Sequence, residues 1–336
     1  MQKSCTIILA AGKGTRLKSE TPKVLHEILG LPLIYYPLNL AAKLGSETIC
    51  VVGHGRDAVG AYLERFPVRQ VVQDPPLGTG HAVLMARRAL EETDAENVII
   101  LPGDMPLVEY SSLASLMEVY RASHSPIGVL TARMPDPTGY GRIVRDWENR
   151  MIAIVEHHEA DERQRMIDEI NTGVYVIDKS FLLRAVEGLS PDNAKQEFYL
   201  TDIVRMARFA ASYQVPDYRE AHGINSRAQL CEAAQVMQMR VNRALMDEGV
   251  TLLDPSTAWI SPLARIGKDV EIWPNVHILG ECRVDSQVRI MPNTWIRNSC
   301  IGTRSIIRNG SMIENATISP DSDLPAHSVI DGSHIG

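Results

Sequence analysis

The chain has 336 residues, which exceeds what a single hydrophobic core usually holds, so two domains are expected. No stretch reaches the roughly 18 apolar residues that cross a bilayer, and no membrane partner is expected. The net charge of −7 argues against a binder of nucleic-acid polymers, because such binding needs a basic surface. The 5 cysteines are scattered without a C-x-x-C pair, which argues against a disulfide framework or zinc site and fits a reducing cytoplasm.

Up to about residue 226, short apolar segments alternate with longer segments of helical periodicity. We expect strands at residues 5–9, 48–52, 68–72 and 97–101. Helices are expected at residues 31–44, 58–66, 81–90 and 112–121. This alternation predicts βαβ units with a mainly parallel sheet, whose ligands bind in the loops after the carboxyl ends of the strands.

A helix is expected at residues 227–248, because apolar side chains recur there with helical spacing up to Gly249. We interpret residues 227–250 as a linker helix. It would join a first domain at residues 1–226 to a second domain at residues 251–336.

Aliphatic side chains recur every six residues in the second domain. The positions are Ile260, Ile266, Ile272, Ile278, Val284, Ile290 and Ile296, then, after a shorter step, Ile301, Ile307 and Ile313, and after another Ile318, Leu324 and Ile330. This hexapeptide pattern predicts a parallel β-helix, expected to be left-handed, with a little over four coils at three anchors per coil. A sandwich with coincidental spacing is the alternative, and the strict register of the first seven anchors argues against it.

The loop after the first expected strand combines glycines with basic side chains. It reads L-A-A-G-K-G-T-R-L at residues 9–17 and is followed by Pro22 and Lys23. The glycines allow backbone N–H groups to approach a phosphate chain, while Arg16 and Lys23 add positive charge. The loop is not a P-loop, which would need G-x-x-x-x-G-K-S/T. It is not the G-x-G-x-x-G dinucleotide fingerprint either, because Leu17 holds the place of the third glycine.

This loop resembles that of the sugar-phosphate nucleotidyltransferases, and further motifs narrow the resemblance. They are Gln73 with L-G-T-G at 77–80, G-D-M-P-L at 103–107, D-P-T-G-Y-G-R-I at 136–143, I-V-E-H at 154–157, E-I-N-T-G at 169–173, Y-L-T-D at 199–202 and G-I-N at 223–225. Over residues 5–230 this ordered set resembles the GlmU family of bacterial N-acetylglucosamine-1-phosphate uridyltransferases. The resemblance implies a Rossmann-like nucleotidyltransferase domain with a mixed, mainly parallel sheet.

The same resemblance implies a reaction. UTP and N-acetylglucosamine 1-phosphate would give UDP-N-acetylglucosamine, a peptidoglycan precursor used in cell wall biogenesis, and pyrophosphate, with Mg²⁺ as cofactor. The alternatives are another sugar 1-phosphate or nucleotide, and a non-catalytic subunit that binds a nucleotide sugar.

The resemblance also implies roles for the residues that match its motifs. Asp104 and Asn225 would bind Mg²⁺, and Arg16 and Lys23 would be catalytic. Nucleotide contacts would come from Leu9, Ala11, Gly12, Gly14, Thr15, Gln73, Gly78 and Thr79. Sugar contacts would come from Gly103, Gly141, Glu156, Asn171, Tyr199 and Thr201. Taken alone, Asp104 and Asn225 could equally be turn residues, and Glu156 a solvated charge at a strand end.

The chain departs from the family pattern at two places. Pro102 stands where the family often has a tyrosine or a small residue, so a sugar or nucleotide contact would differ. The β-helix is shorter than in the bifunctional family, and Asp323 and Leu324 stand near an expected arginine. We therefore expect this chain to lack the family's acetyltransferase activity. The resemblance implies that the β-helix assembles a homotrimer, with a dimer or a monomer as the alternatives. Whether the native chain extends past Gly336 is left open.

Overall fold

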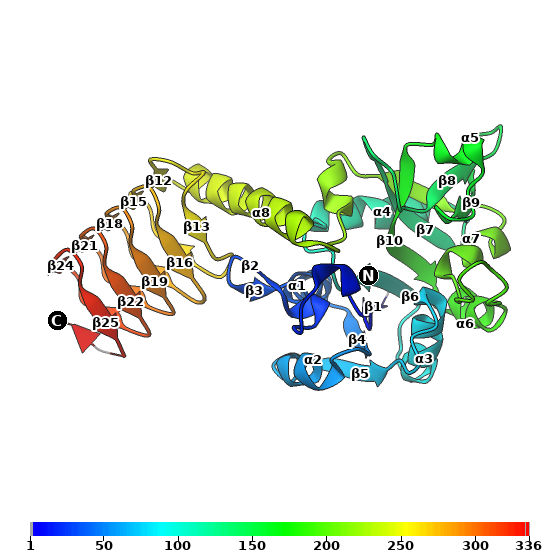
Figure 1. The fold of residues 1–336 in the computed structure, drawn as a ribbon, viewed down its shortest axis with the longest axis horizontal. Helices are drawn as coiled ribbons and strands as arrows, with labels where there is room; N and C mark the ends of the chain where they lie inside the picture. Colours follow the sequence, from blue (N-terminus) through cyan, green and yellow to red (C-terminus); the bar gives the residue numbers. More distant parts are fainter. Residues whose placement is uncertain (1–2, 333, 336) are drawn as a thin grey trace. The chain divides into compact units, whose positions relative to one another are not determined.

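The computed structural model describes residues 3–332 and 334–335 (Figure 1). The chain divides into two compact units, Met1–His26 with Pro32–Gln229, and Glu27–Leu31 with Leu230–Gly336. The limits predicted at residues 226 and 250 stay predictions. No sequence pattern indicated that the short segment Glu27–Leu31 groups with the C-terminal unit.

The first unit contains a nine-stranded mixed sheet with the central order β11-β7-β10-β6-β1-β4-β5 (Figure 1). Strand β1 pairs in parallel with β4 and β6, β4 with β5, and β11 with β7. Strand β10 is antiparallel to β6, β7 and β8, and β8 is antiparallel to β9. The expected Rossmann-like domain with a mixed sheet is confirmed. The strands are β1 (Ser4–Ala10), β4 (Glu47–Val52), β5 (Val68–Val72), β6 (Asn97–Pro102), β7 (Ile127–Arg133), β8 (Arg142–Arg145), β9 (Met151–Val155), β10 (Glu169–Asp178) and β11 (Ala211–Gln214).

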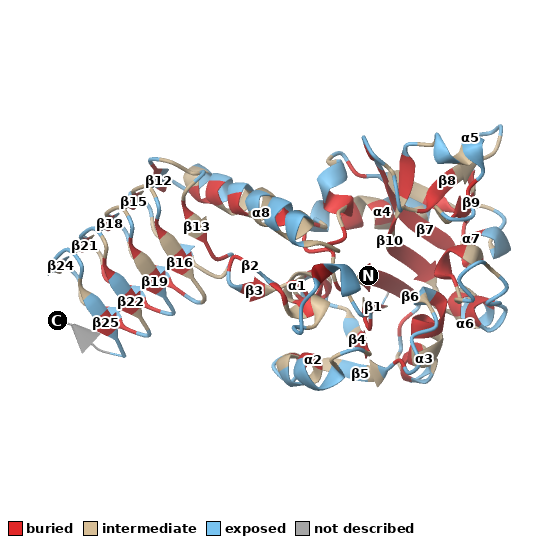
Figure 2. Cartoon of the chain, viewed as in Figure 1, coloured by how far each residue is buried: buried red, intermediate tan, exposed pale blue. Residues whose placement is uncertain are grey.

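Helices cover both faces of this sheet, and the central strands are buried (Figure 2). Within β1, for example, Ile7 packs into one apolar core and Ile8 into the other, as the alternation of side chains along a strand requires. The helices are α1 (Tyr35–Lys43), α2 (Arg56–Leu63), α3 (Thr79–Glu91), α4 (Tyr110–Ala122), α5 (Glu162–Arg165), α6 (Lys179–Glu187), α7 (Ile203–Met206) and α8 (Arg227–Asp247). Short 3₁₀ helices lie at η1 (Thr15–Leu17), η2 (Lys23–Leu25), η3 (Leu200–Asp202) and η4 (Tyr218–Ala221).

The helix predicted at residues 31–44 was wrong at its beginning. Its first residues form β3 (Leu31–Pro32), which pairs with β2 (Glu27–Ile28), and the helix begins only at Tyr35. Leu29 and Gly30 both have positive φ angles, of 52° and 78°, as a tight hairpin turn requires. Pro32 in addition disfavours helical backbone at the residue before it.

The second unit contains a β-helix of short parallel strands stacked in three sheets (Figure 1). Each sheet has five strands, so the described residues form five coils, where the sequence predicted a little over four. The difference arises because β12 and β26 add strands outside the thirteen anchors. The strands are β12 (Thr251–Leu252), β13 (Trp259–Ile260), β14 (Arg265–Ile266), β15 (Glu271–Ile272), β16 (His277–Leu279), β17 (Arg283–Val284), β18 (Arg289–Ile290), β19 (Trp295–Arg297), β20 (Cys300–Ile301), β21 (Ile306–Ile307), β22 (Met312–Glu314), β23 (Thr317–Ile318), β24 (Asp323–Leu324), β25 (Val329–Asp331) and β26 (His334–Ile335). Its left-handedness stays a prediction.

The predicted aliphatic anchors stack in columns along the β-helix. In one column Ile260 pairs with Ile278, which pairs with Ile296, and this continues through Ile313 to Ile330. All five side chains are buried, so each coil contributes one anchor from each sheet to a continuous apolar core.

Truncation of one anchor tests this packing. Ile307 is fully buried on β21, whereas the neighbouring Ile306 is only partly buried. Ile307→Ala is expected to reduce the free energy of unfolding of this unit by about 2–5 kcal/mol. Ile306→Ala, the matched control, should cost less than about half as much, because less apolar area is lost. Urea denaturation followed by tryptophan fluorescence measures both; equal losses would contradict the inward orientation of the anchors.

Among the described residues, no helix is both long enough and apolar enough to cross a lipid bilayer.

Candidate functional site

A cavity of about 610 Å³ opens in the first unit at the carboxyl ends of β1 and β6. Strands β1 and β6 are parallel neighbours, so the loops that follow them lie at the same edge of the sheet. The sequence analysis predicted that ligands bind in these loops. Of the residues predicted for the site, the lining contains Leu9, Ala11, Gly12, Lys23, Gln73, Gly78, Thr79, Asp104, Glu156, Asn171, Tyr199 and Thr201.

Lys23, Asp104 and Asn225 meet at one end of this cavity. The Lys23 ammonium forms an ion pair with the Asp104 carboxylate and donates a hydrogen bond to Asn225 Oδ1 at 2.7 Å. Asn225 Nδ2 donates to the Gly223 carbonyl at 3.2 Å, which orients the amide so that its oxygen faces Lys23. The Ile224 N–H donates to the Asp104 carbonyl at 3.0 Å and joins the two loops. Two oxygen ligands therefore converge on one positively charged atom.

These two oxygens suit a magnesium ion. Mg²⁺ prefers oxygen ligands and commonly takes only one or two from the protein, with waters and substrate phosphates completing its octahedron. Among the described residues, no group of three or more His, Cys, Asp or Glu side chains is arranged to hold a metal. Asp104 and Asn225 are thus two oxygen donors that could hold a divalent cation.

The glycine loop packs closely against Lys23. Gly14 has a φ angle of 60°, and a Cβ atom there would lie 2.6 Å from Lys23 Cβ, so a larger residue would displace the lysine. Thr15 and Arg16 follow on η1 and are exposed, and neither they nor Gly14 line the cavity. The catalytic role of Arg16 therefore stays a prediction.

The hydroxyl of Tyr140 is influenced by the charge of Asp104. Burial and the negative charge of Asp104 raise the pKa of its hydroxyl, while the positive charge of Arg16 opposes this rise. The charges of Asp104 and Arg16 thus act in opposite directions on this hydroxyl.

Gln73 and the loop at 77–80 form a second wall. The Gln73 side chain is buried, and its Nε2 donates to the Gly78 carbonyl at 2.9 Å. The φ angle of Gly78 is 102°, and a Cβ atom there would come within 2.6 Å of the Phe198 carbonyl oxygen. Only glycine fits this conformation and this close approach. Thr79 Oγ1 accepts a hydrogen bond from the Leu200 N–H at 3.2 Å, so this wall is attached to the next one.

Glu156, Thr201 and Tyr199 form the third wall. Thr201 Oγ1 donates to Glu156 Oε1 at 3.0 Å. Burial raises the pKa of Glu156, while the Thr201 hydrogen bond and the charge of Lys195 oppose this rise. Tyr199 is only 7% exposed, and its hydroxyl has no hydrogen-bond partner in the described part of the chain. Burial, together with the charge of Glu159, raises the pKa of that hydroxyl to about 12, so it is a neutral group that can bond a ligand.

Asn171 on β10 completes this wall. Its Nδ2 donates to the Tyr175 hydroxyl at 2.8 Å, and its N–H donates to the Gly141 carbonyl at 2.9 Å. A Cβ atom on Gly141 would lie 2.9 Å from Ile154 Cγ2, so a larger residue would push this wall apart. Gly141, Gly103 and Asn225 do not line the cavity themselves.

Several lining residues were missed by the sequence analysis. They are Ala10, Lys13, Val24, Pro76, Ala82, Gly173, Tyr175, Lys195, Glu197 and Leu200, and Pro102 was noted only as a departure from the family. Lys195 and Glu197 lie in an irregular loop that is organised by Asn193. The Asn193 Oδ1 accepts hydrogen bonds from the N–H groups of both residues at 3.2 Å. The only sequence signal was the turn-forming run S-P-D-N directly before them.

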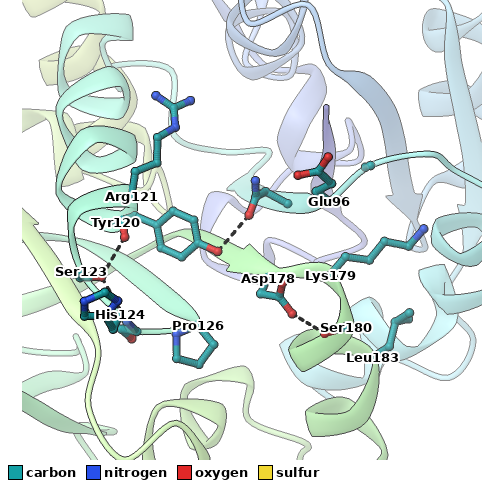
Figure 3. A pocket seen from close by; sticks show the side chains of 13 residues that line it. Glu96, Tyr120, Arg121, Ser123, His124, Pro126, Asp178, Lys179, Ser180 and Leu183 are labelled. Atoms are coloured by element: carbon teal, nitrogen blue, oxygen red, sulfur yellow. Dashed lines mark hydrogen bonds between the residues drawn. The ribbon is translucent and has the colours of Figure 1, made fainter. Parts of the chain in front are cut away.

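A larger cavity of about 990 Å³ lies at the opposite ends of the strands (Figure 3). Several of its polar groups bond to neighbouring protein atoms. Tyr120 donates to Asn97 Oδ1 at 2.9 Å and Ser180 to Asp178 Oδ1 at 2.6 Å. Lys179 donates to the Thr93 carbonyl at 2.6 Å. It contains none of the residues predicted for the site. The smaller cavity is therefore the candidate site.

Comparison with known proteins gives consistent results. Residues 6–173 match the family described as MobA-like NTP transferase domain. The chain is 42% identical over 327 residues to "Bifunctional protein GlmU" of Geotalea uraniireducens (strain Rf4), covering 96% of this chain and 71% of that protein. It is 41% identical over 317 residues to the protein of the same name from Syntrophotalea carbinolica, covering 93% and 68%.

A solved structure is similar to the chain in fold. "The Crystal Structure of UDP-glucose pyrophosphorylase complexed with UDP-glucose" has a TM-score of 0.60 at 21% sequence identity. The alignment covers 71% of this chain and 100% of that one. At this identity the likeness supports the fold alone.

Proposed function

Because the chain belongs to the GlmU family, we propose that it is a uridylyltransferase acting on N-acetylglucosamine 1-phosphate. UTP and this sugar phosphate would give UDP-N-acetylglucosamine and pyrophosphate. The observation that supports this most directly is the convergence of Lys23, Asp104 and Asn225 beside the glycine loop. Fixed positive charge and oxygen ligands for a cation are what a reaction between a triphosphate and a sugar phosphate, both anions, requires.

In this reaction an oxygen of the sugar phosphate attacks the α-phosphorus of UTP. A new P–O bond forms, and the bond from that phosphorus to the pyrophosphate oxygen breaks, so pyrophosphate leaves with the electron pair. The attacking oxygen is already anionic near neutral pH, and no general base is needed. The difficulty is the approach of two anions, and the positive charges of Lys23 and Arg16 would reduce it. The N–H groups of the glycine loop would bind the phosphate oxygens.

Magnesium would be held by the Asp104 carboxylate and Asn225 Oδ1, and would neutralise the phosphate charge when bound. Gln73, Gly78 and Thr79 would contact the uracil. Glu156, Asn171, Tyr199 and Thr201 would orient the sugar and its N-acetyl group. The Tyr199 hydroxyl, which has no hydrogen-bond partner among the described residues, supports this proposal.

The direct test is release of pyrophosphate with UTP and Mg²⁺ against a panel of sugar 1-phosphates. We expect the highest kcat/KM with N-acetylglucosamine 1-phosphate, followed at a distance by glucose and N-acetylmuramic acid 1-phosphates. CTP, ATP and GTP in place of UTP test the base. A higher kcat/KM with a different sugar 1-phosphate would identify that compound as the substrate instead. No release with any combination would favour a non-catalytic subunit.

The raised pKa of Glu156 predicts a pH dependence. A carboxyl group whose pKa lies above its ordinary value becomes neutral at a higher pH than usual, and a neutral group accepts hydrogen bonds from sugar hydroxyls less strongly. The KM for the sugar phosphate should therefore rise as the pH falls through the pKa of Glu156. Glu156→Gln should have a high KM that lacks this component. Both proteins share the titration of the substrate phosphates, so the difference between their profiles isolates Glu156. Identical profiles would contradict the prediction.

For the second unit we propose assembly into a homotrimer; whether the protein also transfers acetyl groups, as a second activity, is tested separately. An outward column on the sheet of β13 carries Trp259, His277, Trp295, Met312 and Val329. Met312 is 43% and Val329 78% exposed, which supports a contact surface there. Light scattering measures the mass, and an assay with acetyl-coenzyme A and glucosamine 1-phosphate tests the second activity. A cytoplasmic location is part of this proposal, since all five cysteines are free.

A further inference from the structure

The first turn of α8 contacts the loop that carries Asn225. Gln229 Oε1 accepts a hydrogen bond from the Asn225 N–H at 2.8 Å. Two residues earlier, Arg227 Nε donates to the Leu17 carbonyl at 3.3 Å, at the end of the glycine loop. The same helical turn thus reaches both loops that bring positive charge and oxygen ligands to the site.

Three contacts define the position of Asn225. Gln229 holds its backbone N–H, the Gly223 carbonyl holds Nδ2, and Lys23 contacts Oδ1. The first contact fixes the backbone and the second selects which end of the amide faces the cavity. If the backbone of Asn225 rotated, Oδ1 would no longer converge with the Asp104 carboxylate. A cation that takes only two oxygens from the protein is sensitive to the loss of either one.

We propose that Gln229 is a positioning residue for the reaction, because it holds Asn225 so that its side-chain oxygen faces the Asp104 carboxylate. This rests on the proposed function, in which these two oxygens bind the metal. Gln229 does not line the cavity, so it acts through Asn225 and not through substrate. Residues that orient metal ligands in this way typically change metal affinity or activity by about 10- to 100-fold when replaced.

A purely structural role of Gln229 in starting α8 can be separated from this. The cap contact at the beginning of the helix runs from the Gln229 backbone N–H to Ser226 Oγ at 3.2 Å. A substitution at Gln229 keeps that backbone bond and removes only the side-chain oxygen. Loss of the side chain therefore tests the contact to Asn225 and leaves the cap in place.

The experiment compares four proteins: wild type, Gln229→Leu, Gln229→Glu and Gln235→Leu. Gln229→Glu retains an acceptor oxygen at the same distance from the backbone. Gln235 is an exposed glutamine on the same helix, so Gln235→Leu controls for the substitution itself. Mn²⁺ binding is titrated by electron paramagnetic resonance with UTP present and no sugar phosphate. The kcat and the KM for UTP are measured separately as pyrophosphate release.

In Gln229→Leu we expect Mn²⁺ binding to weaken about tenfold and kcat at limiting metal to fall by a similar factor. Gln229→Glu should lie within about threefold of wild type, and Gln235→Leu should equal it. Wild-type Mn²⁺ affinity in Gln229→Leu, or failure of Gln229→Glu to restore binding in a folded protein, would overturn the proposal. The titration needs no turnover. If wild type binds Mn²⁺ more tightly than Gln229→Leu does but releases no pyrophosphate, the proposed reaction is refuted and the positioning role is supported.

Discussion

Lys23→Ala is expected to lower turnover by roughly 100-fold or more while leaving metal binding as strong as in wild type, or stronger. The ammonium group supplies positive charge to the phosphates, and removal of one such preorganised donor typically costs about 100- to 1,000-fold in kcat. The same ammonium group contacts both proposed metal ligands, Asp104 and Asn225. Without the ammonium group, the Asp104 carboxylate no longer pairs with a cation that competes with the metal. Turnover and metal affinity should therefore change independently, or in opposite directions.

Lys43→Ala is the control for that prediction, because Lys43 is an exposed lysine in the last turn of α1. Pyrophosphate release gives kcat, and the Mn²⁺ titration gives the affinity. Turnover within a few-fold of wild type in a folded Lys23→Ala protein would remove the main support for the proposed site. A parallel loss of metal affinity would instead indicate that Lys23 organises the ligands.

Asp104→Asn should lower kcat at least as much as Lys23→Ala does. Unlike Lys23→Ala, it should also weaken metal binding. The substitution keeps the size of the side chain and the backbone bond from the Ile224 N–H, so the loop should fold normally. It removes the negative charge that attracts the cation. A bound metal contributes several kcal/mol to the stabilisation of transition-state charge, and about 3 kcal/mol corresponds to roughly 100-fold in rate.

The metal dependence distinguishes this variant from Lys23→Ala. We expect the Mg²⁺ concentration for half-maximal rate to rise strongly in Asp104→Asn and high Mg²⁺ to restore part of the activity. Asp94→Asn changes an exposed aspartate outside the cavity and is the matched control. An unchanged Mg²⁺ dependence in Asp104→Asn would refute the assignment of Asp104 as a ligand.

The sequence predicted the β-helix in more detail than any other part. Each anchor, such as Ile278 or Ile296, is fixed by a repeat that depends only on the neighbouring coils, so local spacing carries the information. The meeting of Lys23 with Asp104 could also be foreseen. Their loops follow strands β1 and β6, which are adjacent and parallel.

Features that depend on distant pairing were not predictable from the local pattern. The antiparallel direction of β10 places Asn171 and Tyr175 in the cavity, but strand periodicity is the same for both directions. Lys195 reaches the cavity on a loop held by side-chain bonds to Asn193, which have no periodic signal. The glycine-loop motif, conversely, grouped Arg16 with the cavity, whereas the 3₁₀ turn at η1 leaves that side chain exposed outside the lining.

The columns of the β-helix make the second unit modular. Each strand pairs only with the strand one coil before and one coil after it, as Ile307 does with Ile290 and Leu324. Inserting or deleting a complete coil preserves every remaining pair. Smaller changes of spacing between strands are also tolerated, because Ile301 and Ile318 follow steps of five instead of six residues and are still buried. Evolution and engineering can therefore alter the number of coils stepwise while the fold of the first unit and its cavity stays the same.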